Sequence, residues 1–495
     1  MKKISSWLNL LSSLSMLLAF TGCEPPGSKY NLIYHSSHLG RQNLLTETNT
    51  IELPVKGNIP AWLKGTLLRN GPSWFGAYPP DASMHWFDGL AMLHGFKFEN
   101  NKVFYTNKFL ETGALITARN EGVFAFRGFA TNLYDDLLQN VVSLLFLDEG
   151  SPNANVNLYR VAGNYLALTE LTPPVQFDKN NLCTIGSFPY QDDLPKANVF
   201  ESAHPQYDID ERCFYNYIVN FFPQTSYLIY KIQEDSSMRI PLVEITEDKP
   251  SYMHSFSITK NYIIFTEYPF KLVDSILFSG KPFIKNYAWD KCAKTKITII
   301  NKNCPCDIKT YYADPFFSFH HINAYEMGSN IILNIIAFKD SKIVERLGFF
   351  PECLEPSFLL DMKIDLAANT VDSRRISFGG SADLPRINPA YNGRPYRYFY
   401  AVKFDKDRHL VMKWDTFRNV PSFWSQEGCF AGEPVFIQNP LGNGKEDDGV
   451  ILSLVLDANK KSSFLLILDA KNLKELARVG LLFSVPFGLH GQFYK

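Results

Sequence analysis

Three observations predict that this chain is an all-β protein built from many short strands. Aromatic residues make up 15% of the sequence, and such side chains are enriched in strands. Short apolar runs alternate with turn residues, as is typical of a sandwich, a barrel or a propeller. A hairpin-like pattern also recurs along the chain, and it fits propeller blades better than a Greek-key sandwich.

The apolar runs are rich in β-branched and aromatic residues, and they are bounded by Asn, Asp, Gly and Lys. We expect strands at residues 103–105, 227–230, 262–265, 297–300, 331–336 and 451–456. The recurring pattern is a strand, an aspartate, a short polar turn and another strand, and it contains Asp178, Asp365 and Asp469. An aspartate side chain accepts a hydrogen bond from the backbone two residues later and so closes an Asx turn. Repeated hairpins of this kind fit propeller blades better than a Greek-key sandwich, although the repeat is too degenerate to give a period.

The composition excludes several classes of protein. The chain has 495 residues, of which 46% are hydrophobic and 20% charged, with a net charge of −1. These values exclude disorder as the main state, and the balanced charge gives no electrostatic footprint for nucleic acid. Cys304 and Cys306 form the only close cysteine pair. Because no second pair follows, a loop disulfide or two free thiols are favoured over a zinc site.

The first residues predict export. Lys2 and Lys3 precede an apolar stretch at 8–20, which is too short to span a bilayer and is typical of a signal peptide. Small residues before Cys23 resemble a bacterial lipoprotein processing site, although Phe20 stands where an aliphatic residue is usual. A plain secretory signal with an incidental Cys23 is the alternative. We therefore predict a signal peptide at 1–22, a tether or lead-in at 23–50, and a single catalytic domain at 51–495.

Two apolar stretches break the strand pattern. Residues 133–147 place Leu137, Leu138, Val141, Leu144 and Leu145 on one helical face, with Phe124, Phe126 and Phe129 nearby. Residues 272–278 form the second stretch. Each is interpreted either as a buried cap helix or as an apolar lip that dips into a membrane and admits an apolar substrate.

Eight short motifs occur in a fixed order. Residues 65–72 predict a strand closed by a Gly-Pro turn, and residues 85–94 predict an Asp-Gly turn that feeds a strand. The others are Ser-Ala-His-Pro at 202–205, Met-His-Ser-Phe at 253–256, Phe-His-His-Ile-Asn-Ala-Tyr-Glu at 319–326, Leu-Pro-Arg-Ile-Asn at 384–388, Gly-Glu-Pro at 432–434 and Gly-Leu-His-Gly at 488–491. In this order they resemble the motifs of the carotenoid cleavage oxygenase family, and above all its animal-type branch of β-carotene oxygenases and retinoid isomerases.

The resemblance implies a seven-bladed β-propeller with a helical cap over the metal-bearing face. It also implies one Fe(II) per subunit, held by His204, His254, His320 and His490, and residues 319–326 are interpreted as the end of one metal-lining strand. Adjacent side chains of a strand face opposite sides, so only one of His320 and His321 can point at the axis, and the motif favours His320. The remaining histidines, His35, His38, His85, His94 and His409, are expected to be ordinary core or loop residues.

The resemblance further implies that carboxylates orient the ligating histidines. By motif, Glu170 stands behind His254 and Glu433 behind His490. Asp383 stands behind His320, where the family has a glutamate, so its side chain is one methylene shorter. We expect either a bridging water or a shifted strand at this contact.

The function implied is an Fe(II)-dependent dioxygenase that cleaves a conjugated double bond of a carotenoid or apocarotenoid, with O2, to carbonyl products. The alternatives are a retinoid isomerase or stilbene-cleaving oxygenase on the same site, and a non-catalytic isoprenoid-binding propeller. An exported protein held at a membrane by the apolar lip and a lipid on Cys23 is the expected location, and a cytosolic, peripheral membrane protein is the alternative. The exact substrate, the bond cleaved and the oligomeric state stay open.

Overall fold

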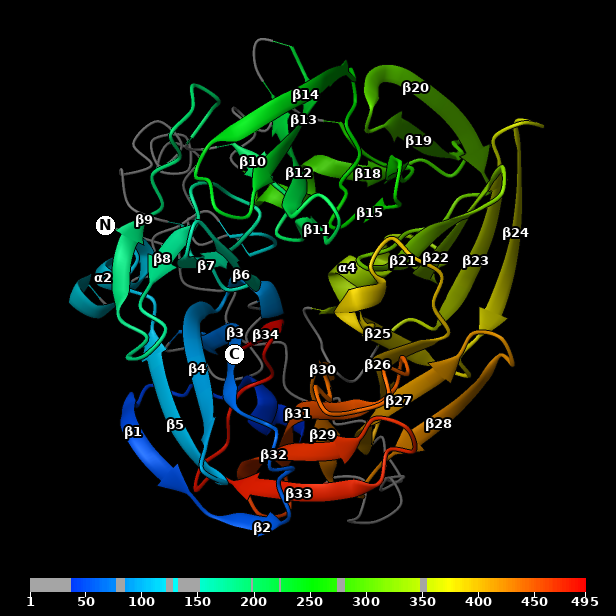
Figure 1. The fold of residues 1–495 in the computed structure, drawn as a ribbon. Helices are drawn as coiled ribbons and strands as arrows, with labels where there is room; N and C mark the ends of the chain where they lie inside the picture. The colour runs from blue at the N-terminus through cyan, green and yellow to red at the C-terminus, as the bar shows by residue number, and fades with distance from the viewer. Residues whose placement is uncertain are drawn as a thin grey trace, which may run out of the picture.

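The computed structural model describes residues 37–76, 85–121, 128–131, 152–196, 199–221, 224–273, 281–347 and 354–495. In these residues antiparallel sheets are arranged in a ring around a central axis (Figure 1). The all-β prediction is therefore confirmed. The six predicted runs lie within β5 (Lys102–Phe109), β13 (Ser226–Gln233), β16 (Tyr262–Glu267), β19 (Thr295–Asn301), β22 (Asn330–Phe338) and β31 (Gly449–Asp457).

Counted over the described residues, the strands form seven blades. The first contains β1 (Thr48–Leu53), β3 (Gly65–Trp74), β4 (Leu90–Glu99), β5 and β34 (Gly491–Tyr494). The second contains β6 (Asn157–Val161), β7 (Asn164–Leu168), β8 (Val175–Phe177) and β9 (Thr184–Ser187). The third contains β10 (Phe200–Glu201), β11 (Gln206–Asp208), β12 (Cys213–Asn220), β13 and β14 (Arg239–Thr246).

The remaining four blades follow in chain order. The fourth contains β15 (Ser257–Ile258), β16, β19 and β20 (Cys304–Ala313), with a separate pair β17 (Phe270–Leu272) and β18 (Tyr287–Trp289) inserted. The fifth contains β21 (His321–Met327), β22, β23 (Ser357–Asp365) and β24 (Thr370–Ser377). The sixth contains β25 (Ser381–Arg386), β26 (Tyr398–Asp405), β27 (Arg408–Asp415) and β28 (Val420–Trp424). The seventh contains β30 (Val435–Gln438), β31, β32 (Ser462–Asp469), β33 (Glu475–Gly480) and β2 (Val55–Gly57), and β29 (Cys429–Ala431) links it to the sixth.

The two ends of the described chain close the ring. The C-terminal strand β34 pairs with β3, where Thr66 faces Tyr494, so the first blade takes its innermost strand from the end of the sequence (Figure 1). The N-terminal strand β2 pairs with β33, where Val55 faces Val479. These exchanges join the first and last blades and so close the ring.

The repeated aspartate pattern marks one hairpin that recurs in several blades. Asp178, Asp365 and Asp469 each accept hydrogen bonds from the backbone N–H groups two and three residues later. Each hairpin joins the third strand of a blade to its fourth strand, and Asp415 forms a fourth example between β27 and β28. In all four turns the residue four positions after the aspartate has a positive φ: 61° at Leu182, 54° at Asn369, 53° at Asn419 and 59° at Leu473. The predicted Asx turns are therefore confirmed as blade hairpins.

The hydrophobic core lies between neighbouring blades, which explains why strand sequences are apolar on both faces. In β22, Ile331, Leu333 and Ile335 pack in the large cluster shared with the fourth blade. The next residue, Ile336, faces the other way and packs with Phe399 and other residues of the sixth blade. A continuous apolar run such as 331–336 results because both faces of the sheet are covered.

One local prediction is wrong in the structure, and one pair of alternatives is decided. The predicted Gly-Pro turn is wrong, because β3 continues through Gly71 and Pro72 to Trp74, with an irregularity in register after Pro72. A proline is tolerated in a strand at such a bulge. A Cβ on Gly71 would lie 2.6 Å from Gly488 Cα, so the glycine allows the segment before His490 to pack directly on β3. Cys304 and Cys306 are both free thiols on β20 rather than a loop disulfide.

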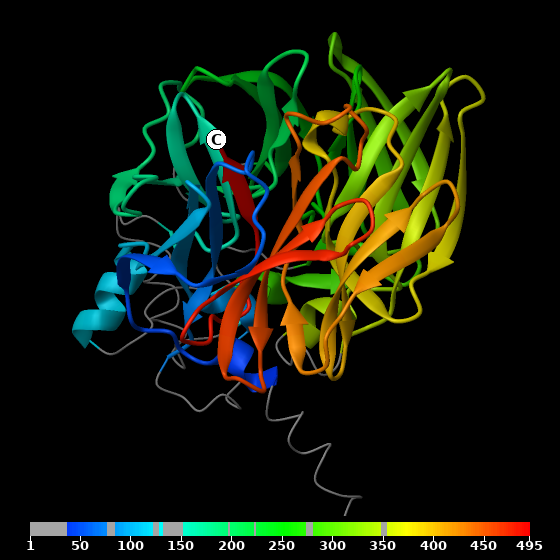
Figure 2. The same ribbon diagram turned by 60° about the horizontal axis from the view of Figure 1, so that its bottom comes forward.

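The predicted helical cap is not confirmed. The signal sequence, Cys23, and the apolar stretches at 133–147 and 274–280 lie outside the described residues, while Leu272 ends strand β17. The helical elements are η1 (His38–Arg41), η2 (Trp86–Asp88), α2 (Gly113–Glu121), η3 (Phe283–Asn286), α4 (Lys342–Arg346) and η5 (Pro389–Tyr391). The longest of these, α2, lies at the outer edge of the ring (Figure 2).

Candidate metal centre

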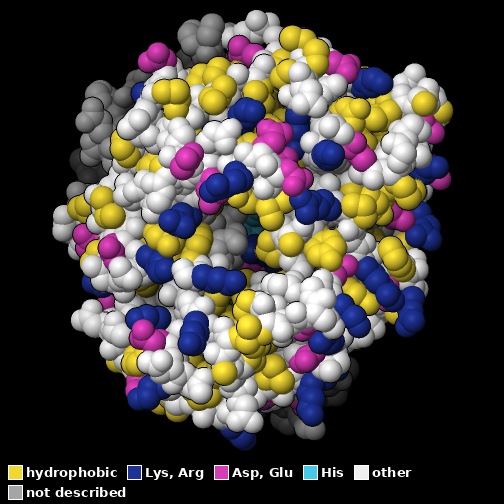
Figure 3. All heavy atoms as spheres, in the orientation of Figure 1, with side chains coloured by type: hydrophobic (Ala, Val, Ile, Leu, Met, Phe, Trp, Pro, Cys, Tyr) yellow, Lys and Arg dark blue, Asp and Glu magenta, His cyan; other side chains and the backbone are white. Residues whose placement is uncertain are grey.

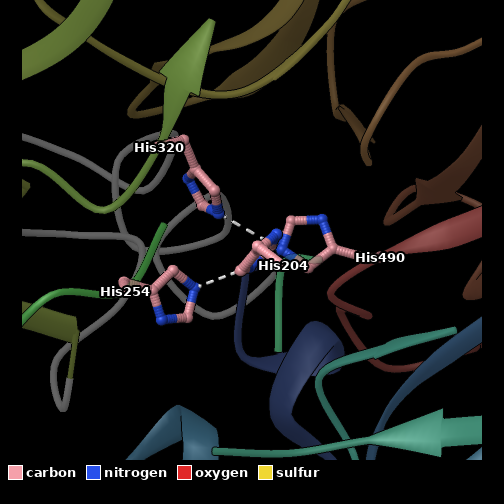
Figure 4. Close-up of side chains that lie close together, drawn as sticks. All are labelled: His204, His254, His320 and His490. Carbon is pink, nitrogen blue, oxygen red and sulfur yellow. Dashed lines mark hydrogen bonds between the residues drawn. The ribbon is translucent and has the colours of Figure 1, made fainter. Parts of the chain in front are cut away.

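The four predicted histidines come together at the centre of the ring (Figure 4). His204 lies between β10 and β11, and His254 lies three residues before β15. His320 and His490 directly precede β21 and β34. Each therefore belongs to a different blade and sits where the chain enters an inner strand, so the interpretation of 319–326 as the end of a strand is wrong. Their ligand atoms all lie within 4.8 Å of one another.

The ring nitrogens of these histidines converge in pairs. His204 Nε2 lies 2.9 Å from His254 Nε2, and His320 Nε2 lies 3.2 Å from His490 Nε2 (Figure 4). Two imidazole nitrogens that bind one ion at about 2.1 Å and at right angles are about 3.0 Å apart. The observed separations are those of neighbouring ligands on a single ion.

Buried carboxylates fix the tautomers of three of these rings. His254 Nδ1 lies 2.6 Å from Glu170 Oε1, His320 Nδ1 lies 2.7 Å from Asp383 Oδ1, and His490 Nδ1 lies 2.7 Å from Glu433 Oε1. A carboxylate accepts, so each Nδ1 carries the proton and each Nε2 presents a lone pair. The Nε2 lone pairs of His320 and His490 then face each other at 3.2 Å, an arrangement that a cation between them makes favourable. The donor set therefore fits a divalent metal ion.

Burial keeps His204 and His490 in the neutral form that a metal requires. Desolvation lowers the pKa of His490 to about 4, even though the Glu433 carboxylate opposes this shift. Burial and then the three neighbouring histidines hold the pKa of His204 well below its usual range. Metals bind the neutral imidazole, so the rings are ready for a ligand role at neutral pH.

Asp383 reaches His320 directly because the backbone beside it departs from a regular strand. The register of β25 against β26 shifts between Asp383 and Arg386, and Leu384 has a φ of 58°. The Leu384 N–H donates to Asp383 Oδ1 at 2.8 Å. A bulky residue is rarely found in the left-handed region. The shorter aspartate contacts Nδ1 without an intervening group, so the contact does not need the expected bridging water.

Two arginines that the sequence did not single out support Glu433. Arg69 Nη1 donates to Glu433 Oε2 at 2.7 Å, and Arg386 Nη1 lies 3.4 Å from Glu433 Oε1. Burial raises the pKa of Glu433, but Arg386, His490 and Arg69 together hold it at about 2. The sequence contained a signal for both arginines. Arg69 is a charged residue in the apolar strand 65–72, and Arg386 belongs to the motif at 384–388. Neither position indicates its partner without the fold.

Tyr252 was also missed by sequence reasoning. Its hydroxyl group lies 2.9 and 3.1 Å from the two carboxylate oxygens of Glu170 and donates to this carboxylate, and it is 3.2 Å from His254 Nδ1. The side chain is buried, and its position two residues before His254 places both side chains on the same side of the chain. Tyr252 therefore fixes the carboxylate that orients His254.

His85, His94, His321 and His409 have ordinary structural roles, whereas His35 lies outside the described residues. His321 points away from the centre, with Nδ1 2.9 Å from Ser257 Oγ and Nε2 2.8 Å from Thr266 Oγ1. The choice of His320 over His321 is thus explained by the alternation of side chains along a strand. His85 Nε2 contacts the Val344 carbonyl oxygen, His94 Nδ1 contacts the Tyr105 hydroxyl, and His409 is buried.

Two apolar cavities lie beside the centre. The first comprises about 460 Å³ of space between atoms, part of which is open to solvent, and includes His254, His320 and His490 in its wall. Apart from these, Asp383 and Ser381, its lining is apolar: Trp86, Phe87, Val156, Phe319, Phe338, Ile343, Leu347, Leu354, Leu384, Phe404 and Leu489. A second cavity of about 410 Å³ shares Trp86, Leu384 and Phe404 with it.

The centre is also approached along the ring axis. In the space-filling view the middle of one face is hollowed, and a histidine side chain is visible at the bottom of the hollow (Figure 3). His204 is half-buried, whereas His254, His320 and His490 are buried. The centre therefore has an apolar side formed by the first cavity and a more exposed side at His204.

Comparisons with known proteins agree with this geometry. The profile of the family described as retinal pigment epithelial membrane protein matches residues 41–495. Mouse β,β-carotene 15,15'-dioxygenase is 31% identical over 91% of this chain and 90% of its own length, and a mitochondrial carotenoid-cleaving dioxygenase of Macaca fascicularis is 29% identical over 90% and 92%. Structures of a mutant and a cobalt-substituted form of Synechocystis apocarotenoid oxygenase each superpose with a TM-score of 0.82 at 27% identity, covering 93% of this chain and 99% of theirs.

Proposed function

Since the chain belongs to the retinal pigment epithelial membrane protein family, which is the family of the carotenoid oxygenases, we propose that it is an Fe(II)-dependent dioxygenase. It cleaves a conjugated double bond of a carotenoid or apocarotenoid and yields two carbonyl products. The observation that carries the proposal is the quartet His204, His254, His320 and His490, whose ligand atoms lie within 4.8 Å beside an apolar cavity.

The donor set supports iron as the resident metal. Imidazole is a good ligand for Fe(II), and four neutral imidazoles leave two positions of an octahedron open. When bound, the iron supplies the activation of O2. The chain's own residues keep the Nε2 lone pairs of His254, His320 and His490 directed inwards, because Glu170, Asp383 and Glu433 accept the Nδ1 protons of these three rings.

The first cavity supplies binding and orientation. A polyene has few polar atoms, so burial between Phe87, Phe319 and Phe404 provides most of its binding free energy. Phe87 stacks on His254 with ring centroids 6.3 Å apart, and Phe319 meets the same ring edge-on at 5.5 Å. These contacts place both phenylalanine rings beside the metal centre, where they would hold one stretch of the polyene next to the Nε2 atoms, and the apolar wall would exclude water from the reacting bond.

Iron content and the visible spectrum of the substrate test the proposal. The purified protein, loaded with Fe(II), is incubated under air with a panel of carotenoids and apocarotenals, and the products are identified by mass spectrometry. Cleavage bleaches the polyene absorption band, isomerisation shifts it slightly, and binding alone preserves it. Bleaching with two carbonyl products is expected. A preserved band in a protein that contains stoichiometric iron contradicts the proposal.

Adjacent histidines give a matched pair of control variants. His320→Asn removes one nitrogen of the centre, whereas His321→Asn changes a neighbour that contacts Ser257 and Thr266 instead. We expect the first variant to lose iron and cleavage together and the second to retain both. Equal loss in the two variants would indicate that structural damage, rather than the metal centre, explains the effect.

The cellular location is a separate proposal, supported by the sequence of residues 1–23. We propose that the chain is exported and held at a membrane through a lipid on Cys23. In the described residues, no helix combines the length and the apolar character needed to cross a bilayer. A lipid anchor would place the apolar cavity close to membranes, where carotenoids dissolve.

A further inference from the structure

We propose that the Ser381 hydroxyl group is a specificity-determining group that binds an oxygen atom of the substrate, so that the natural substrate is an oxygenated polyene rather than a hydrocarbon. This inference rests on the proposed function and deepens it by naming the substrate class. Ser381 is a polar side chain in the wall of the first cavity, and it is not part of the metal centre.

Ser381 lies on the face of β25 that points into the metal site. The strand is regular from Ser381 to Asp383, since these two residues face Phe404 and Val402 of β26. Side chains two residues apart in a strand lie on the same face. Asp383 contacts His320 in the site at 2.7 Å, so the side chain of Ser381 also lies on this face. Phe404, which faces Ser381 across the pair, lines the same cavity.

The Ser381 hydroxyl group has no hydrogen-bond partner in the described part of the chain, although the residue is only 6% exposed. The other polar residues of this cavity wall are His254, His320, His490 and Asp383, and all four are engaged in the metal centre. An unpartnered buried hydroxyl group is unfavourable, whereas alanine at this position would have no such cost. A ligand oxygen in the cavity removes the cost.

The chemical consequence is discrimination by a single hydrogen bond. A hydroxyl group or carbonyl oxygen on the polyene can pair with Ser381 Oγ, since serine both donates and accepts. A hydrocarbon of the same length fills the apolar lining equally well but leaves the serine unpaired. Sites built to pair with a substrate oxygen reject the analogue that lacks it. The residue therefore separates apocarotenals and hydroxylated carotenoids from β-carotene-like hydrocarbons.

The test compares Ser381→Ala with the wild type on two ligands, an apocarotenal and a hydrocarbon carotenoid. We expect Ser381→Ala to lower kcat/KM for the apocarotenal about tenfold and to leave the hydrocarbon unchanged or slightly improved. Ser381→Thr keeps the hydroxyl group and should keep the preference. Equal effects on the two substrates, or no effect on either, would overturn the proposal.

Ser73→Ala is the matched control. Ser73 Oγ is likewise buried without a partner among the described residues, but Ser73 lies on β3 and lines neither cavity. We expect this variant to leave both substrates unaffected, and the unfolding temperatures of the three variants show whether each one is folded.

A binding measurement separates this proposal from the proposed function. Quenching of tryptophan fluorescence, to which Trp86 in the cavity wall contributes, gives the Kd of each ligand in the absence of O2. If the iron-loaded wild type cleaves neither ligand, the proposed function fails. The serine proposal then stands only if Ser381→Ala weakens apocarotenal binding about tenfold relative to hydrocarbon binding, and it fails if the ratio of the two Kd values is unchanged.

Discussion

His320 Nδ1 lies 2.7 Å from Asp383 Oδ1, the same separation that joins His490 Nδ1 to the longer side chain of Glu433. The aspartate carboxylate therefore reaches the same distance from Nδ1 although its side chain is one methylene shorter. Beside it, Leu384 adopts a φ of 58° at the point where the register of β25 shifts against β26. This contact predicts how the metal centre responds to mutation.

Asp383→Asn should weaken metal binding about 10- to 100-fold, because an amide accepts the Nδ1 proton less strongly and orients His320 less firmly. Asp383→Glu should also weaken it, since the contact is already 2.7 Å long and an added methylene has to be accommodated by moving the strand. Competition with a chelator measures both affinities. An increase in affinity in Asp383→Glu would contradict the view that the backbone has adjusted to aspartate.

Arg69→Met should destabilise the fold by about 3–5 kcal/mol, because it leaves the buried carboxylate of Glu433 without its closest cation. The two side chains are 3% and 0% exposed and 2.7 Å apart. Urea unfolding of the metal-free protein provides the measurement. Arg374→Met removes an exposed arginine that pairs with Asp361 on the outside of the fifth blade, and this control should change stability by less than about 1 kcal/mol.

Tyr252→Phe should cost about 1–3 kcal/mol of stability, since the carboxylate of Glu170 loses a buried donor. Metal affinity should fall as well, because the same carboxylate holds His254. Tyr312→Phe is the matched control on exposed surface of β20 and should behave as the wild type in both measurements. A stable variant with unchanged metal affinity would show that the Tyr252 hydroxyl group is dispensable.

His409→Leu should make stability less sensitive to acid. Burial lowers the pKa of His409 to about 3, against an ordinary value of 6.5, and the rings of Phe404, Phe430 and Phe487 surround it. Between pH 6.5 and 3 the unfolded chain therefore binds a proton that the folded chain does not, so stability is lost as the pH falls through this window.

Without the imidazole, the unfolded chain binds one proton fewer in this pH window. The free energy of unfolding should therefore depend on pH less steeply than in the wild type, by about 1.4 kcal/mol per pH unit at most. Urea unfolding at pH 7, 6 and 5 gives the pH dependence of the free energy of unfolding for the variant and for the wild type. The variant and the wild type should respond differently below pH 6.5 and in parallel above it. His94 and His321, whose pKa values burial also lowers to about 3, keep part of the acid sensitivity in the variant.

Cys23→Ala should release the protein from the membrane fraction if a lipid on Cys23 is the anchor. Membrane and soluble fractions of a bacterial host that expresses the full chain, probed by immunoblot, provide the measurement. Retention of the variant in the membrane fraction would leave the apolar surface, rather than a lipid, as the means of attachment.

The sequence by itself determined the features that depend on neighbouring residues. Alternation and turn chemistry are local, so the six apolar runs and the aspartate hairpins at Asp178, Asp365 and Asp469 were predictable from residues a few positions apart. The ordered motifs, through their resemblance to a known family, further indicated which four histidines to examine. Local patterns failed where packing overrides them, as at Gly71 and Pro72, where β3 continues because the neighbouring segment packs on the glycine.

Only the tertiary structure decided how distant residues meet. The ring closes through β34 on β3 and β2 on β33, and this closure brings His490 to within 3.2 Å of His320 across 170 positions of sequence. The contacts of Arg69, Arg386 and Tyr252 with buried carboxylates, the contact of Asp383 with His320 and the unpaired hydroxyl group of Ser381 follow from the arrangement of the blades around the ring. No local pattern encodes them, because each depends on which blade faces which, and hydrophobic packing between whole sheets sets that arrangement.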